Sequence, residues 1–292
     1  PLPKLRVTTM AMQVIGPPPR SARRRRPGRV RGTGGSSRIV AAVVAELVRL
    51  LQPMQSDTEA MIPVLVENSG VIAAVAALER QKETWRRVLG PSLKGIAGRW
   101  IRMTSERDRL NLQKSLAKAL GVPAIAIFDE PAVRNAVDLM GMEAVHLISS
   151  IPDMYHDKIL AAVMKSYQQQ PLPEGRDLMA EVREIGKIEL NERAKLIAVD
   201  QTNKMHCMVT QARQTSLGIE EYIWRTAEDQ RVVGNPSGLY PKGSRLHMNH
   251  FEREGVKFRW DSPPPDGHPG WPIRGRCHAE PVFTDSSRLT LQ

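Results

Sequence analysis

The chain has 292 residues, 41% of them hydrophobic, and its 42 Lys and Arg residues against 31 Asp and Glu residues give a formal net charge of +11. This length permits two ordinary domains with a sizeable core, and the composition excludes collagen, a coiled coil throughout and wholesale disorder. Ten of the basic residues lie between Lys4 and Arg38, where no acidic residue occurs. The remaining residues carry 32 positive and 31 negative charges, so a nearly neutral body follows a basic segment.

Residues 1–38 predict an extended basic arm. Three consecutive prolines, an arginine run and a Gly/Ser stretch make this segment too polar and too broken to bury a core. We expect a partner to order it, because isolated termini seldom hold a fixed structure. Arginine binds phosphates and carboxylates alike, so packaged DNA and an acidic protein surface are both candidate partners. The binding residues expected in this arm are Arg20, Arg23, Arg24, Arg25, Arg26, Arg29, Arg31 and Arg38.

The next region, residues 39–175, predicts a helical domain. Apolar residues recur at three- and four-residue spacing over 39–51, 62–89, 96–120 and 132–149. We expect breaks at Gly90-Pro91, at 121–123 and at Ile151-Pro152, because Gly and Pro interrupt helices. Residues 122–128 fit either a short buried strand or a connector, and residues 168–176 are typical of a linker. The run 39–51 is broken by Glu46 and Arg49 at helical spacing, so it is an amphipathic helix and not a signal peptide or membrane span.

Residues 176–292 predict a small α+β module. A helix over 177–215 is expected to end at Gly218, which is a typical C-terminal cap. Apolar and polar residues then alternate, with a period of two, over 222–226, 256–260 and 278–283. This alternation is typical of strands that pair in an antiparallel sheet. The predicted fold class is therefore α+β, with a mainly helical N-terminal body, a C-terminal module built on an antiparallel sheet, and the basic arm.

Cofactor chemistry receives little support from the sequence. Cys207 and Cys277 are the two cysteines, which excludes a disulfide framework and an all-thiolate zinc site and suits a reducing cytosol. There is no Gly-Lys-Ser/Thr phosphate loop and no dinucleotide glycine fingerprint, so an ATPase or a Rossmann enzyme is not supported. We expect no cofactor and no bound metal.

A series of short motifs in the C-terminal module is more specific than composition. In chain order it reads Tyr222-Ile223-Trp224-Arg225-Thr226, Asp229-Gln230-Arg231-Val232, His250, Gly255, Phe258-Arg259-Trp260-Asp261, Pro263-Pro264, Gly267-His268-Pro269-Gly270, Ile273, Arg276-Cys277 and Ala279-Glu280-Pro281. Over residues 190–283 this order resembles the C-terminal domain of the phage Mu protein F-like family of head morphogenesis proteins, also called minor head proteins.

This resemblance implies a non-enzymatic bacteriophage virion protein, made in the host cytoplasm and assembled into the head. The implied partner is the portal protein, with the major capsid or scaffold protein and packaged double-stranded DNA as further candidates. Two departures stand out: residues 233–249 separate Arg-Val from His250, and Gly275 replaces the first cysteine of the family's Cys-Arg-Cys. The residues expected to be structural in this motif are Trp224, Arg225, Asp229, Arg231, His250, Trp260, His268, Pro269, Cys277 and Glu280.

Alternative chemistries remain open for the same residues. A phosphodiester-cleaving nuclease or toxin-like enzyme could use a general acid/base set, formed by Asp229, Arg231, His250 and His268. A zinc set could consist of His250, His268, Cys277 and His278, although the spacing matches no ordinary zinc finger. A free DNA-binding accessory factor could act through the arm. Against these, we expect Asp229 and Arg231 to pair across a turn, and Trp224 and Trp260 to fill the core face of the sheet.

Overall fold

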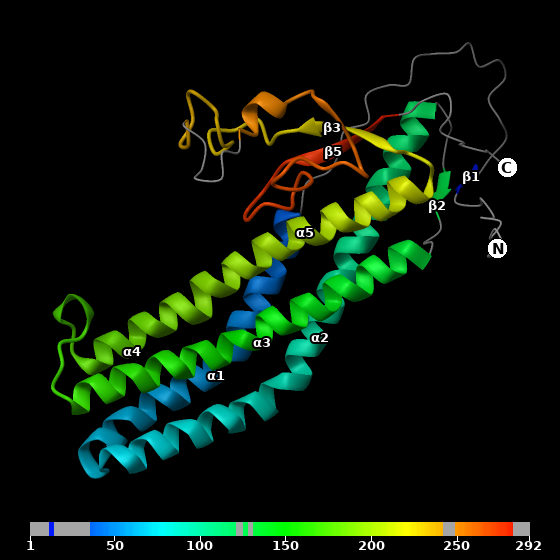
Figure 1. Ribbon diagram of the computed structural model, residues 1–292. Coiled ribbons are helices and arrows are strands. Elements are labelled where there is room, and N and C mark those ends of the chain that lie inside the picture. Colours follow the sequence, from blue (N-terminus) through cyan, green and yellow to red (C-terminus); the bar gives the residue numbers. More distant parts are fainter. Residues whose placement is uncertain (1–11, 15–35, 121–124, 128–130, 242–248, 283–292) are drawn as a thin grey trace, which may run out of the picture. The chain divides into compact units, whose positions relative to one another are not determined.

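The computed structural model describes residues 12–14, 36–120, 125–127, 131–241 and 249–282. The fold is mainly helical with a small antiparallel sheet, which confirms the predicted α+β class (Figure 1). The arginines of the arm before Ser36 lie outside the described residues, whereas Arg38 is exposed in the first turn of the first helix.

The helices are α1 (Ser37–Asn68), α2 (Val71–Leu120), α3 (Pro131–Tyr167), α4 (Leu178–Gly186) and α5 (Arg193–Ser216), and the π-helical turn η2 (Lys187–Glu192) joins α4 to α5. The short 3-10 turns are η1 (Pro173–Gly175) and η3 (Phe251–Arg253). The strands are β1 (Met12–Val14), β2 (Ile125–Ile127), β3 (Glu221–Arg225), β4 (Lys257–Arg259) and β5 (His278–Val282).

Helix ends follow local capping chemistry. The Ser36 side chain accepts a hydrogen bond from the Ile39 amide at 3.4 Å, and Asp177 accepts one from the Ala180 amide at 2.7 Å, as N-cap residues do. At the end of α5, Gly218 has a φ of +72° and the Ile219 amide bonds the Gln214 carbonyl. This is a Schellman ending, so the predicted cap is confirmed.

Two predicted helix breaks are wrong, because α2 continues through Pro91 and α3 through Pro152. A proline inside a helix removes one backbone hydrogen bond and costs about 3 kcal/mol, so packing must offset it. Leu89 and Leu93 on either side of Pro91 are buried. Gly90 also has no Cβ to collide with the proline ring. The actual boundary between the first two helices lies at Ser69–Gly70, inside the predicted helix 62–89.

The chain forms two compact units. We call Ser36–Arg102 with Met140–Thr202 the helical unit, and Met103–Leu139 with the chain from Asn203 onward the sheet unit. The sequence predicts domain boundaries at residues 38 and 175. These boundaries say which segments fold independently, so they stay a prediction.

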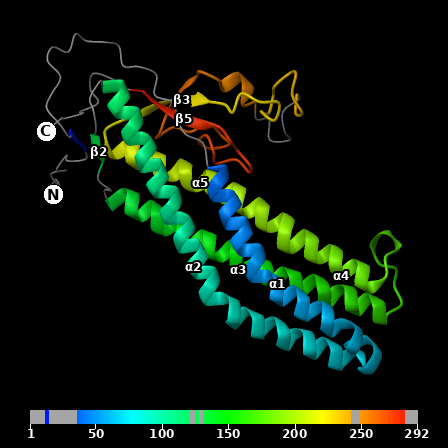
Figure 2. The same cartoon turned by 180° about the vertical axis from the view of Figure 1, so that it is seen from behind.

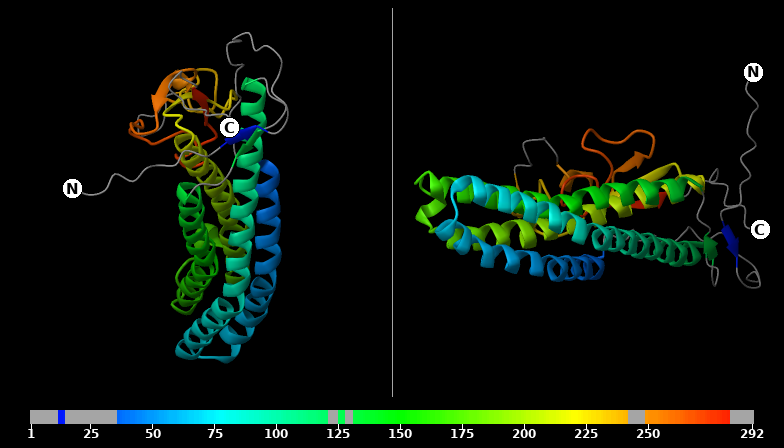
Figure 3. Two further views of the ribbon diagram at one scale, coloured as in Figure 1. Left: turned by 90° about the vertical axis from the view of Figure 1, so that its right-hand side faces the viewer. Right: turned by 90° about the horizontal axis from the view of Figure 1, so that it is seen from below.

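The helical unit packs four helical segments around one core. They are α1, the first part of α2, the second part of α3, and α4 with η2 and the start of α5 (Figure 2). Leu47, Leu51 and Met54 on one stripe of α1 are fully buried. The turn at Ser69–Gly70 and the connection 168–177 lie at the same end of this unit (Figure 3). The predicted linker 168–176 is thus a connection between α3 and α4.

Helix α1 also has the length and hydropathy of a membrane span. The core helix of a soluble bundle passes the same test of length and composition. Within the most apolar 18-residue window of α1, 28% is buried inside the protein.

The sheet unit contains a three-stranded antiparallel sheet in the order β4-β3-β5. Tyr222 on β3 lies opposite Phe258 on β4 and Pro281 on β5, so the three predicted strands pair as expected. Burial alternates along β3, which places Tyr222 and Trp224 on the buried face. They form a core with Trp260, Cys277 and Ala279. The expectation that Trp224 and Trp260 fill the core face is therefore confirmed.

A second sheet of two strands pairs β1 with β2. Residues 125–127 therefore form a strand, as the strand alternative for residues 122–128 predicts, whereas the rest of that segment and the predicted break at 121–123 lie outside the described residues. Ile127 in β2 is buried. Its partner β1 comes from the segment predicted to be an arm, so residues 12–14 of that segment take up a strand conformation.

Candidate functional site

The motif residues of the sheet unit meet in three linked polar clusters around β3 and β5. The first is centred on Arg225 at the end of β3. Its guanidinium donates to Glu254 Oε1 at 2.9 Å and also to Glu280 on β5. Glu254 in turn accepts from the amide and the hydroxyl of Thr226 at 2.7 and 2.9 Å. Burial alone would raise the pKa of Glu254, but the bonds from Thr226 and Arg225 outweigh it and lower that pKa.

The second cluster is centred on Asp229, in the turn that follows β3. The Arg231 amide and guanidinium donate to its carboxylate at 2.9 and 3.2 Å, which confirms the predicted pair across a turn. Arg276 binds both oxygens of the same carboxylate, one of them at 2.6 Å. Hydrogen bonding to Arg276 is the main cause that holds the pKa of Asp229 well below its usual range. Arg276 therefore ties the chain next to β5 to the turn after β3.

The third cluster is a buried chain of hydrogen bonds through His250. His250 Nε2 lies 2.9 Å from Asp266 Oδ2, and its Nδ1 lies 3.6 Å from Cys277 Sγ. Asp266 also accepts from Arg253 at 2.7 and 2.8 Å, and the Arg253 guanidinium stacks over the Trp224 ring at 4.9 Å. This cluster joins the loop after residue 249, the loop before His268 and the start of β5.

Burial in the third cluster favours the neutral forms of His250 and Cys277. Burial lowers the pKa of His250, while Asp266 acts in the opposite direction. Burial also raises the pKa of Cys277 to about 11, so at neutral pH this sulfur is a thiol and not the thiolate that attacks or ligates. The Asp266 carboxylate nevertheless orients the His250 imidazole, as carboxylates do in sites where histidine acts as a general base.

His268 belongs to a separate contact. Its Nδ1 lies 2.9 Å from the Tyr222 hydroxyl, and its ring packs against Trp260 at 4.8 Å. The following Pro269 is buried, and Gly270 has a φ of +96°. A Cβ at Gly270 would approach the Asn203 carbonyl oxygen of α5 to 3.1 Å. The Gly-His-Pro-Gly turn is therefore fixed against the sheet and α5 by close packing.

The structure brings some of the predicted sets together and separates others. His250 and Cys277 are neighbours, whereas Asp229 is bound by Arg231 and Arg276, and His268 by Tyr222. The predicted acid/base set is therefore divided among the second cluster, the third cluster and the separate contact of His268 with Tyr222. Within the described ranges of the chain, no three His, Cys, Asp or Glu side chains are arranged to hold a metal ion.

Three members of the clusters were missed by sequence reasoning. They are Glu254, Asp266 and Arg253. Arg253 ends the short turn η3, Glu254 follows it and Asp266 lies in a loop, so none belongs to a segment with a recognisable hydrophobic period. Each reaches its partner only through the tertiary fold. The available signal was the acidic residue after Pro263-Pro264, since Asp266 directly precedes the Gly-His-Pro-Gly motif.

Comparisons with known proteins add one relative. No family model and no solved structure matches the chain. The chain is 28% identical over 196 residues to an uncharacterized protein of Haemophilus influenzae. That match covers 66% of this chain and 40% of the relative, so the chain spans less than half the length of the protein it resembles.

Proposed function

We propose that this chain is a structural minor head protein of a tailed bacteriophage, which acts in head morphogenesis by binding the portal vertex. The observation that supports the proposal is that the motif side chains form hydrogen bonds and ion pairs within the module itself. Arg225, Asp229, Glu280 and Arg276 bind one another or Glu254, and His250 binds Asp266. Side chains that are engaged in this way set the shape of a rigid module.

A rigid module of this kind suits an assembly protein. Parts that join a shell need a surface of fixed shape, and the clusters connect β3, β5 and the loops between them into one framework. The order of these residues also resembles that of the phage Mu protein F-like proteins, a resemblance that implies a head component. Portal protein is the proposed first partner, and the capsid or scaffold protein and packaged DNA are further candidates.

The experiment is to produce the chain with the portal and capsid proteins and to purify the heads. Mass spectrometry of gradient-purified heads should find the chain, and co-purification with isolated portal should occur without capsid protein. A chain that stays in the soluble fraction and binds neither portal nor heads would contradict the proposal.

A nuclease or toxin-like enzyme is the second candidate, favoured by one observation. The carboxylate of Asp266 orients a buried imidazole, as in sites where His acts as a general base. Incubation with single- and double-stranded DNA and RNA, with and without divalent metal, tests it. Cleavage that is lost by ~10²-fold or more in H250Q, at an unchanged melting temperature, would favour the enzyme over the assembly protein. A third candidate, a free DNA-binding factor, would bind DNA and not portal.

A further inference from the structure

The exposed face of α2 in the helical unit carries a row of basic residues. The stretch 84–102 contains five basic and no acidic residues. Three of them, Arg87, Lys94 and Arg102, are exposed and follow one another at intervals of seven and eight residues. Such intervals bring side chains to the same face of a helix, ~10–12 Å apart. These three residues, which we call the cation row, extend over ~22 Å of helix.

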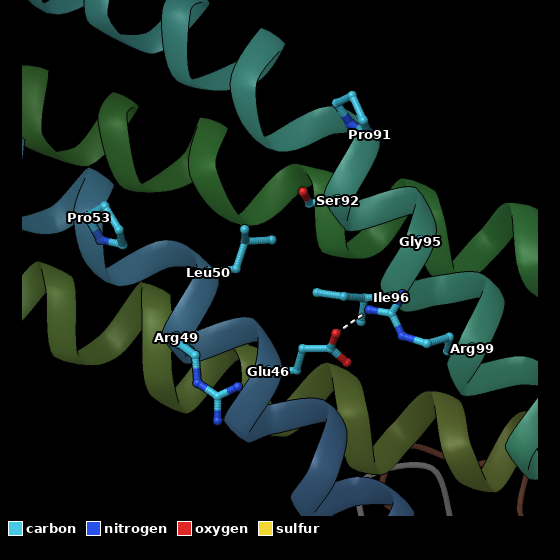
Figure 4. Close-up of a pocket in the computed structure, with 9 residues that line it drawn as sticks. All are labelled: Glu46, Arg49, Leu50, Pro53, Pro91, Ser92, Gly95, Ile96 and Arg99. Carbon is cyan, nitrogen blue, oxygen red and sulfur yellow. Dashed lines mark hydrogen bonds and ion pairs between the residues drawn. The ribbon is translucent and has the colours of Figure 1, made fainter.

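The other two basic residues of this stretch are neutralised within the helical unit. Arg86 binds Asp153 of α3 at 2.9 Å, and Arg99 is directed to Glu46 of α1, as Figure 4 shows. These two guanidinium groups therefore turn to neighbouring helices. The members of the cation row make no hydrogen bond or ion pair with any residue that the structure describes. Three positive charges thus remain on the exposed face.

The surface between these charges offers little for a protein partner to hold. Gly90, Pro91 and Gly98 are the described residues that lie between the cations on this face, and the space beside Gly90 is open. The Arg102 guanidinium lies along the helix over Gly98, where a Cβ would be 3.4 Å from Nη1. Protein partners bind mainly through aromatic or aliphatic anchors that fill pockets, and exposed ion pairs alone contribute little.

Duplex DNA has the charge that complements this face. A duplex carries one negative charge per ~1.7 Å of its axis, so ~22 Å of axis presents about 13 phosphates. Each cation can therefore bind a phosphate whatever the register, without a pocket for a side chain. Neither end of the chain can supply this charge, because residues 1–35 contain nine basic and no acidic residues and residues 283–292 contain one of each.

We propose that the cation row binds the phosphate backbone of duplex DNA, independently of base sequence. Phosphate contacts fix the position of a protein on a duplex and carry no sequence information. The row would thus be a second DNA contact, separate from the basic arm, that neutralises three further phosphates. The inference rests on the proposed function, in which packaged DNA is a candidate partner of the head protein.

The test measures binding of the full-length chain to a duplex oligonucleotide by fluorescence anisotropy at several salt concentrations. The triple variant R87Q/K94Q/R102Q should lower the slope of log K against log salt by ~2.7, which is ~0.9 for each phosphate no longer neutralised. A control variant removes three exposed basic residues of the same unit from three different helices, with the substitutions R80Q/K165Q/K195Q. Its slope should stay close to that of wild type, although its net charge equals that of the triple variant.

Gly98 allows the charge of the row to be changed without removing a cation. G98E places a carboxylate four residues from both Lys94 and Arg102, a spacing at which opposite charges pair on a helix. It should lower the slope by ~0.9 or more, because at least one cation is then neutralised. G98A adds the same Cβ without a charge and should bind DNA as wild type does. The melting temperature of each variant should not fall below that of wild type.

Three results would overturn the inference. They are equal slopes for wild type and the triple variant, an equal loss of slope in the control variant, and an equal loss in G98A and G98E. The inference is also wrong if the triple variant keeps its DNA slope and loses binding to purified portal, because an acidic protein surface would then occupy the row. The proposed function fails by a different result, in which the chain binds no portal and is absent from purified heads.

Discussion

At the scale of single residues, burial acts on His250 and His268 of the sheet unit in the same direction. Desolvation lowers the pKa of both His250 and His268, while in the unfolded chain a histidine titrates near ~6.5. Between these values the unfolded state binds more protons than the folded state, so acid favours unfolding. We expect stability to be greatest above pH ~6.5 and to fall as the pH drops through ~6 toward 5.

The measurement is the melting temperature by circular dichroism across this pH range. H268Q should keep a polar partner near the Tyr222 hydroxyl and remove one titrating group, so its curve should be flatter than that of wild type. Equal curves for wild type and H268Q would show that His268 does not contribute to the acid sensitivity.

The two arginines that bind Asp229 give a matched pair of substitutions. Arg276 holds both carboxylate oxygens and connects distant segments, whereas the Arg231 side chain is 62% exposed. R276Q should destabilise the folded chain by about 1 kcal/mol, a value reduced by solvent screening of the partly exposed pair. R231Q should change stability by less than ~0.5 kcal/mol. Urea unfolding compares the two, and equal losses would contradict the role given to Arg276.

At the scale of elements, the Schellman ending of α5 sets the direction in which the chain enters β3. Gly218 needs a positive φ, which costs a residue with a side chain ~1–2 kcal/mol. G218A should therefore lower the free energy of unfolding by about that amount. As a control, G98A lies inside α2 with ordinary contact distances, so it should stabilise by up to ~1 kcal/mol. A stabilised G218A would contradict the assigned cap.

The elements that could be predicted from the sequence are those encoded locally. The alternation of Tyr222-Ile223-Trp224 predicts a strand, and Gly218 predicts a helix end. The continuation of α2 through Pro91 could not be predicted, because distant packing of Leu89 and Leu93 decides it. The candidate site divides in the same way. Asp229 and Arg231 are two residues apart and were predicted to pair, while Arg276 and Asp266 reach their partners across the fold.

At the scale of the whole molecule, the charge is concentrated at one end of the chain. Nine basic residues precede Ser36, and they make up most of the net charge of +11. A charge cluster of this kind releases counterions when it binds duplex DNA, so log K falls with log salt by ~0.9 for each phosphate neutralised. We expect the arm to provide most of this salt dependence.

Deletion of residues 1–35 tests this expectation and keeps Ser36, whose side chain caps α1. The truncated chain should show a much flatter salt dependence for binding to a duplex oligonucleotide, measured by fluorescence anisotropy at several salt concentrations. A second variant, with Arg23 to Arg26 changed to Gln, retains strand β1 and should lose ~4 units of slope at most if every arginine contacts a phosphate. Repeating the titration with portal protein in place of DNA shows which polyanion the arm prefers. Full-length and truncated chains that bind both partners equally at every salt concentration would contradict a binding role for the arm, because its charge would then contribute nothing to association.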